Sequence, residues 1–170
     1  MTGSPYTVET LLAREEIHDV VKRLARGTDR LDAELIESCY HPDGFDDHNA
    51  FRGSGSDFAH WVLEVLSPFE ATMHFIGSPL INVDGDVAQV DTYCVAHHLA
   101  HPDETGQQTD LILGLRYVDR FERRHNRWLI AKRVCAFDWS YTVETSHRMT
   151  FHEDWTVGSR DRGDVTYSGV

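Results

Sequence analysis

The chain has 170 residues, of which 41% are hydrophobic and 26% are charged, a balance typical of one folded globular domain. Its formal net charge of −12 argues against nucleic acid and anionic membrane surfaces as partners, because both are bound by clustered Lys and Arg. The basic pairs Arg123-Arg124 and Lys132-Arg133 are isolated from one another.

The N-terminus, MTGSPYTVET, lacks the basic region and apolar run of a signal peptide, and we read Pro5 as part of a short lead-in. No apolar stretch approaches the ~20 residues that a membrane-spanning helix needs. We therefore expect a cytoplasmic protein.

The first half of the chain is dominated by helical patterns. Apolar residues recur at three- and four-residue steps from Val8 onward, and Gly27 is placed to end this helix as a C-cap. The further elements expected in this half are a short helix over 32–39, a Pro-Gly turn over 40–44, a short strand over 45–51 and a helix over 57–66.

The second half is rich in residues that favour strands. An extended stretch over 72–83, broken at Gly77 and Pro79, is followed by a hairpin turn at Asp84-Gly85-Asp86. Long strands are expected over 87–100, 110–122 and 128–141. Helices followed by hairpin-linked strands predict an α+β domain over 1–147, and the polar residues 148–170 predict a tail that wraps the domain or a neighbouring subunit.

Motifs for nucleotide, zinc-ribbon and redox chemistry are absent. The sequence has no GxGxxG, GxxxxGK[ST] or GxSxG pattern, and Cys39, Cys94 and Cys135 form no CxxC pair. His97, His98 and His101 could suggest a metal, but neighbouring strand residues point to opposite faces. We therefore predict neither a metal nor a cofactor, and three reduced thiols.

What remains is an Asp–His combination. Asp29 follows the first helix and His74 sits among apolar residues in Met73-His74-Phe75-Ile76-Gly77. By themselves these residues have plainer readings: Asp29 as a cap of the second helix and His74 as a core histidine.

Several segments in order resemble the SnoaL-like group of the nuclear transport factor 2-like superfamily. They are Gly27-Thr28-Asp29, His41-Pro42-Asp43 with Phe51-Arg52-Gly53, Met73-His74-Phe75-Ile76-Gly77, and the strand pair 116–124 and 128–133. The resemblance implies a cone-shaped, curved antiparallel sheet packed against N-terminal helices, a cystatin-like α+β barrel. It also implies assembly as a homodimer or homotrimer.

Within that superfamily the chain is similar to scytalone dehydratase, bile-acid 7α-dehydratase and hexachlorocyclohexane dehydrochlorinase. The resemblance implies that Asp29 orients His74 and that His74 removes a proton from carbon in an apolar pocket. It further implies that His97 assists departure of a hydroxyl and that Arg133 stabilises a leaving anion, although both could equally be surface residues.

Because the chain departs from those enzymes at several positions, we do not expect it to act on their three substrates. Thr28, His48, Leu115, Tyr117 and Leu24 stand where the enzymes have other residues. We expect His48 and Tyr117 to supply different polar contacts to the substrate. Candidate apolar walls, which could also be plain core, are Phe45, Trp61, Phe75, Tyr93 and Trp139.

The sequence thus predicts a cofactor-independent lyase, dehydratase-like, or an isomerase or cyclase, with a small, mostly apolar cyclic substrate that carries a hydroxyl or ketone. The alternative is a non-catalytic domain of the same fold that binds a small molecule or serves oligomerisation. Whether the Asp29 carboxylate meets the His74 ring inside a pocket discriminates between them.

Overall fold

The computed structural model describes residues 6–145 and 148–169. The lead-in around Pro5 and the predicted domain boundary at residue 147 lie outside these residues. The first helix, α1 (Val8–Asp29), begins at a capping box in which the Thr10 N–H donates to Thr7 Oγ1 at 3.1 Å. Its buried face includes Ile17, Val20 and Leu24, as the helical spacing predicted.

Gly27 does not end α1, as its predicted C-cap role required, but lies inside the helix, which continues to Asp29. A Cβ at this position would lie 2.9 Å from Ile36 Cγ1 and 3.3 Å from the Asp32 carbonyl oxygen. Glycine is therefore needed here because it allows α2 (Ala33–Glu37) to pack closely against α1.

Side chains cap the two shorter helices at their N-termini. Asp32 accepts the Leu35 N–H at 3.1 Å at the start of α2. Ser54 Oγ accepts the Asp57 N–H at 3.0 Å at the start of α3 (Gly55–Leu66).

Seven strands form one sheet. Their bounds are β1 (Tyr40–Asp47), β2 (Arg52–Ser54), β3 (Ala71–Ile76), β4 (Leu80–Asp84), β5 (Val87–Leu99), β6 (Thr109–Arg124) and β7 (Arg127–Glu144). The strand order is β2-β1-β7-β6-β5-β3, and β4 also pairs with β5. All pairs are antiparallel except β1 with β7, which is parallel.

The turn predicted over 40–44 is wrong, because these residues belong to β1. Tyr40 pairs with Ile130 and Phe45 with Lys132, and the register shifts between them. A Cβ on Gly44 would lie 2.8 Å from the Ile130 carbonyl oxygen, so Gly44 lets the irregular strand approach β7. The strand predicted over 45–51 accordingly ends at Asp47.

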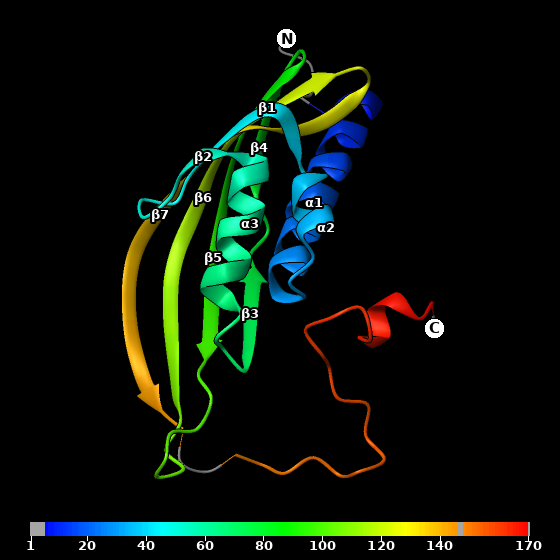
Figure 1. Cartoon of the computed structure of the whole chain (residues 1–170). Helices are drawn as coiled ribbons and strands as arrows, with labels where there is room; N and C mark the ends of the chain where they lie inside the picture. Colours follow the sequence, from blue (N-terminus) through cyan, green and yellow to red (C-terminus); the bar gives the residue numbers. More distant parts are fainter. Residues whose placement is uncertain (1–5, 146–147, 170) are drawn as a thin grey trace.

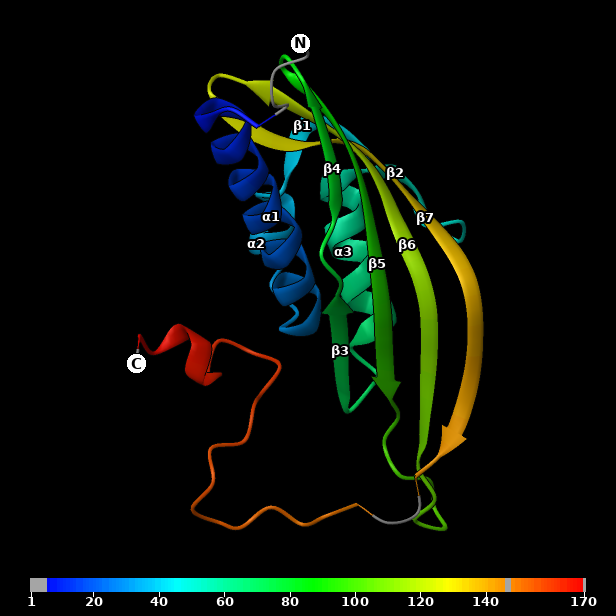
Figure 2. The same cartoon turned by 180° about the vertical axis from the view of Figure 1, so that it is seen from behind.

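The sheet is strongly curved, and the helices α1, α2 and α3 lie on its concave side (Figure 1; Figure 2 shows the view from behind). The sheet does not close into a barrel. This mixed α+β architecture confirms the predicted fold class. The larger buried cluster lies beneath the helices, and a smaller one lies on the sheet: Cys94, Ala96, Leu115, Tyr117 and Cys135.

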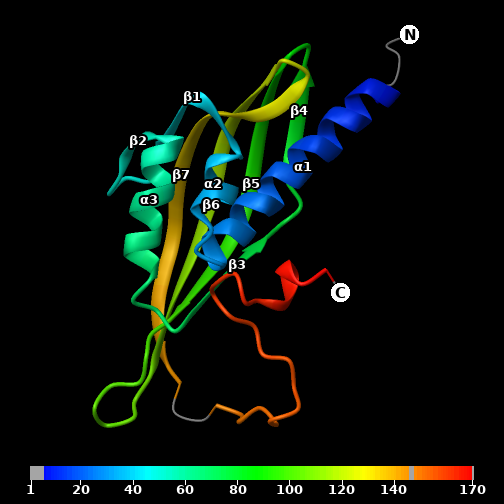
Figure 3. The same cartoon turned by 45° about the vertical axis from the view of Figure 1, so that its right-hand side comes forward.

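Residues 148–169 lie on the helix-bearing side of the sheet, below the helices in Figure 3, and reach the C-terminal end of α1, where a short 3-10 turn, η1 (Val165–Tyr167), forms. The division of the chain into a domain and a tail stays a prediction. Within the described residues, no helix has the length and apolar character required to cross a membrane.

Candidate active site

Asp29 is the last residue of α1, and its carboxylate faces strand β3. Its Oδ1 accepts hydrogen bonds from Thr72 Oγ1 at 2.9 Å and lies 2.7 Å from His74 Nδ1. Its Oδ2 accepts the backbone N–H of His74 at 2.9 Å. Three contacts thus fix the orientation of this one carboxylate against β3.

His74 faces the helices because side chains alternate along β3. Thr72 and His74 lie on the inner face, while Met73 and Phe75 between and beyond them are exposed on the outer face. In the register with β5, His74 pairs with Ala96, a fully buried residue of the smaller cluster. The strand therefore presents the imidazole toward the end of α1.

The Asp29–His74 contact has the geometry of a general-base dyad. The side chains are only 14% and 8% exposed, respectively, so the contact is largely shielded from water. Because an ionised carboxylate can only accept, His74 Nδ1 carries the proton, and Nε2 of the neutral ring keeps its lone pair. An imidazole held in this tautomer can take a proton at Nε2 while Asp29 stabilises the resulting cation.

His98 is the histidine that accompanies His74. Its ring lies edge-on to that of His74, with centroids 5.6 Å apart, and His98 Nδ1 lies 3.2 Å from the Leu111 carbonyl oxygen. Burial, reinforced by the nearby His74, lowers the pKa of His98 to about 4. His98 is consequently neutral at pH 7 and can hold a ligand group without carrying charge.

The structure corrects the position expected for His97. It pairs with Met73 across β3 and β5 and therefore lies on the outer face, opposite to His74. There His97 Nδ1 lies 2.7 Å from Asp110 Oδ2, and its side chain is 41% exposed. In the described part of the chain, no three His, Cys, Asp or Glu side chains are grouped so that they could hold a metal ion.

His48 belongs to a second interior carboxylate–imidazole contact, beside β1, which β7, β6 and β5 separate from β3 in the strand order. Its Nδ1 contacts the buried Asp46, which also accepts the Tyr40 hydroxyl. The His48 ring stacks on Phe58 at 4.5 Å and lies 5.9 Å from the ring of Tyr117. The structure thus brings His48 and Tyr117 together in the interior.

Arg133 is neither on the surface nor free to meet a ligand. It is buried and donates to Asp119 through Nε at 2.8 Å and Nη2 at 2.7 Å. Its guanidinium also lies 4.0 Å from the centre of the Tyr117 ring. Burial lowers the pKa of Arg133, but Asp119 outweighs burial and holds it well above the ordinary value. The role predicted for Arg133 in stabilising a leaving anion does not fit this arrangement.

The predicted apolar walls divide between the two faces. Trp61 lies inside, stacked on Phe51 at 5.2 Å. Phe75, Tyr93 and Trp139 lie outside, 68%, 65% and 46% exposed. Phe75 and Tyr93 alternate with inward residues of their strands, and Trp139 pairs with Gly114 beside a register shift. Phe45 is also exposed. The predicted interior position of Phe75, Tyr93 and Trp139 is therefore wrong, because all three lie on the outer face of the sheet.

Two hollows on the surface of the molecule lie away from Asp29 and His74. One of about 360 Å³ lies between α1 and Arg127–Leu129, and another of about 220 Å³ is lined by Phe75, Tyr93 and Trp139 on the outer face. Neither of these hollows has Asp29 or His74 in its wall, nor do three smaller ones of about 170, 130 and 90 Å³ within residues 6–145 and 148–169. The predicted contact is present, whereas an enclosed pocket beside it is not among these hollows.

Sequence reasoning missed three polar residues of the interior. Thr72 could have been found from its position two residues before His74 on the same strand face. Choosing His98 over His97 required knowledge of how β5 pairs with β3. A slip of one residue in that pairing would move every side chain of the strand to the other face of the sheet. Asp46 was hidden in a segment predicted as a short strand with no assigned face.

The sequence profile of the family described as SnoaL-like domain matches residues 9–134. An uncharacterized protein of Mycobacterium tuberculosis H37Rv is 27% identical over 134 residues, which cover 77% of this chain and 89% of the relative.

Two solved structures show the same fold. The hexachlorocyclohexane dehydrochlorinase of Novosphingobium barchaimii superposes with a TM-score of 0.69 at 16% identity, covering 80% of this chain and 93% of the other. A proposed scytalone dehydratase of Novosphingobium aromaticivorans superposes with a TM-score of 0.66 at 18% identity, covering 83% and 91%.

Proposed function

Since the chain belongs to the SnoaL-like domain family, we propose that it is a cofactor-independent lyase or isomerase acting on a small cyclic compound that bears a hydroxyl or ketone group. The observation that carries the proposal is the shielded contact of 2.7 Å between Asp29 Oδ1 and His74 Nδ1. The names of the two structural neighbours, a dehydrochlorinase and a proposed dehydratase, both denote eliminations, which supports the lyase reading.

In this proposal His74 Nε2 removes a proton from the carbon next to a carbonyl or next to the carbon that bears the leaving group. The electron pair of the C–H bond forms a new double bond. In an elimination the leaving hydroxyl departs with a proton as water, and in an isomerisation the proton returns to another carbon. Asp29 stabilises the imidazolium that exists between the two proton transfers.

His98, which lies on the inner face beside His74, is the auxiliary residue of this proposal in place of His97. With Nδ1 directed to the Leu111 carbonyl oxygen, its Nε2 is left as an acceptor for a substrate hydroxyl. The neighbouring apolar cluster of Cys94, Ala96 and Leu115 would exclude water from the reacting carbon.

The test is turnover of a panel of hydroxylated cyclic ketones by the wild type, Asp29→Asn and His74→Ala. General-base catalysis contributes about 10²- to 10⁴-fold, so both variants should lose kcat/KM by that factor. His97→Ala is the matched control, because His97 has an Asp contact of the same length on the outer face. Equal turnover by all four proteins would refute the proposal.

The second candidate function is ligand binding without turnover. It is favoured by one observation, that neither Asp29 nor His74 lines any of the five hollows described above for residues 6–145 and 148–169. Thermal-shift measurements with the same panel separate the two. Stabilisation by a ligand that is returned unchanged, and that is equal in Asp29→Asn, would support binding alone.

A further inference from the structure

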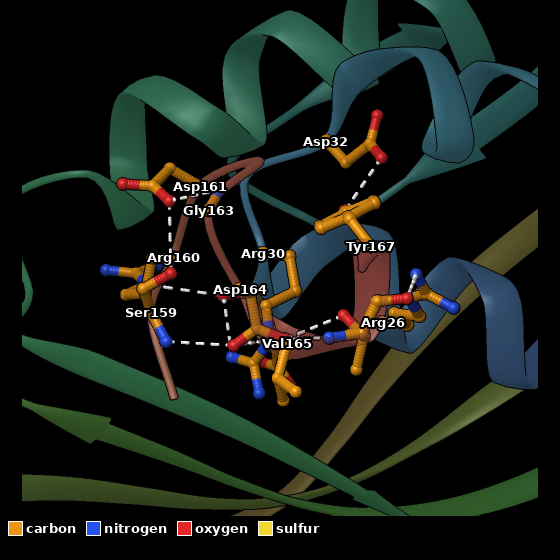
Figure 4. A network of polar contacts seen from close by, with 12 residues as sticks. Arg26, Arg30, Asp32, Ser159, Arg160, Asp161, Gly163, Asp164, Val165 and Tyr167 are labelled. Carbon is orange, nitrogen blue, oxygen red and sulfur yellow. Dashed lines mark hydrogen bonds and ion pairs between the residues drawn. The ribbon is translucent and has the colours of Figure 1, made fainter. Parts of the chain in front are cut away.

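Residues 159–167 fold back onto the end of α1 that carries Asp29 (Figure 4). Asp164 is the centre of this contact. Its Oδ2 accepts the Ser159 N–H at 2.8 Å and lies 3.4 Å from Arg30 Nε, and its side chain is 2% exposed. Hydrogen bonding by Thr166 and Ser159, assisted by Arg30, lowers the pKa of Asp164 to about 2, so the anchor is ionised at pH 7.

A second anchor holds the same segment against α2. Asp32 Oδ1 accepts Arg162 Nη2 at 3.0 Å, and Asp32 Oδ2 accepts the Tyr167 hydroxyl at 2.8 Å. Ser159, immediately before Arg160, is therefore held by Asp164, and Arg162 and Tyr167, after Arg160, are held by Asp32. Arg160 is presented by a segment whose backbone is fixed on both sides.

Arg160 reaches past these anchors to the dyad. Its Nη1 donates to the carbonyl oxygens of Leu66 at 2.9 Å and Phe69 at 2.6 Å. Its Nε donates to the Asp29 carbonyl oxygen at 3.3 Å, and its Nη2 donates to Thr72 Oγ1 at 3.3 Å. One side chain thus links the end of α3, the end of α1 and strand β3.

The hydrogen bond from Arg160 Nη2 determines which way the Thr72 hydroxyl donates its proton. A guanidinium can only donate, so Thr72 Oγ1 accepts from Arg160 and its single proton is left for Asp29 Oδ1, at 2.9 Å. The same Oδ1 receives His74 Nδ1. The contacts form one chain from Arg160 through Thr72 and Asp29 to His74.

We propose that Arg160 is a positioning residue for the dyad, acting through Thr72, an inference that rests on the proposed function of Asp29 and His74. It holds the Thr72 hydroxyl as a donor and thereby keeps the carboxylate in the orientation that receives Nδ1 of His74. The titratable and charged groups that interact with this carboxylate are His74, His98, Cys94 and Arg160.

A substrate-free measurement tests the proposal. In the wild type, the proton on His74 Nδ1 should give a protected, strongly downfield NMR resonance, identified by its loss in His74→Ala. Arg160→Gln should broaden or abolish this resonance while the dispersion of the backbone spectrum is retained. Arg160→Lys should not restore it, because a single ammonium cannot span Thr72 and three carbonyl oxygens.

Thr72→Val provides the decisive comparison, since it removes the hydroxyl without altering residues 159–167. If Arg160 acts through Thr72, the double variant Thr72→Val/Arg160→Gln should be no worse than either single variant. Arg148→Gln is the matched control, because Arg148 pairs with Glu70 and not with the dyad. Effects of Thr72→Val and Arg160→Gln that add, or an unchanged resonance in Arg160→Gln, would overturn the proposal.

Once a substrate is found, Arg160→Gln should lower kcat by about 10- to 100-fold with little change in KM, as misplacement of a catalytic group does. The resonance reports the dyad whether or not the protein turns over a substrate. If Arg160→Gln keeps both its turnover and its resonance while Asp29→Asn is inactive, the positioning role alone would be overturned. If Arg160→Gln loses the resonance but the wild type turns over no substrate, the catalytic function alone would be overturned.

Discussion

Asp119 and Arg133 lie directly opposite each other on β6 and β7, both almost fully buried, and meet through two parallel N–H···O contacts of 2.8 and 2.7 Å. A charge buried in this way is stable only with its partner, because neither ion can be solvated. The pair therefore ties the middle of the sheet's inner face to one specific register.

Breaking this pair should be costly. Arg133→Met should lower the free energy of unfolding by about 3–5 kcal/mol, since it leaves the Asp119 carboxylate buried without compensation. Asp119→Leu/Arg133→Met should recover most of the loss. Urea denaturation measures both, and Arg116→Met, which breaks a partly exposed pair with Asp138, should change the free energy by less than about 1 kcal/mol.

Acidification should destabilise the fold through His98. Its pKa is about 4 in the folded protein against 6.5 for a free histidine, so the unfolded chain binds the proton more tightly. Stability is complete above pH 6.5 and declines as the pH falls toward 4, by on the order of 3 kcal/mol in total. His98→Gln should flatten the pH dependence of urea denaturation over this window, and His152→Gln, on an exposed residue, should leave it as in the wild type.

The three thiols should be inert in the folded protein. Burial raises the pKa of Cys39 to about 11 and that of Cys94 and Cys135 to about 12. The thiolate is the reactive form, so at pH 8 labelling by a disulfide reagent should be slowed at least about 100-fold relative to the unfolded chain. Rapid labelling of one thiol without denaturant would show that its part of the core opens readily.

Self-association is expected on the outer face of the sheet. Met73, Phe75, Leu80, Tyr93 and Trp139 are large apolar residues exposed there, and such a patch is typical of a protein–protein interface. Phe75→Glu/Tyr93→Glu should reduce the mass found by sedimentation velocity to that of a monomer. Leu12→Glu, at an exposed position of α1, is the control and should leave the assembly intact. A wild type that sediments as a monomer would contradict a homodimer or homotrimer.

The elements with strong periodicity could be predicted from the sequence. The apolar stripe of α1 and the hairpin turns at Gly85 and at His125-Asn126, whose residues adopt positive φ angles, are local signals. The parallel pairing of β1 with β7 could not be predicted, because its partners lie about 90 residues apart and Pro42 and Gly44 suggest a turn.

The candidate site also contains residues that could be predicted from the sequence and residues that could not. Asp29 and His74 were found because a resemblance supplied a contact that neither residue's local sequence shows. The faces of His97, Phe75 and Tyr93 depend on strand register, which composition does not determine. Arg160 carries no sequence signal at all, since the Asp29 carbonyl oxygen that it contacts is 131 residues earlier.

This separation has a consequence for how the protein is made. Arg160 leaves the ribosome after every strand of the sheet, so a nascent chain can assemble the sheet and the helices before the guanidinium reaches Thr72. Docking of residues 159–167 beside Asp29 and Thr72 is then a late event, separable in time from folding of the scaffold. Purification tags and reporter fusions are accordingly better joined upstream of α1 than placed where they would pull residues 159–167 from their seat.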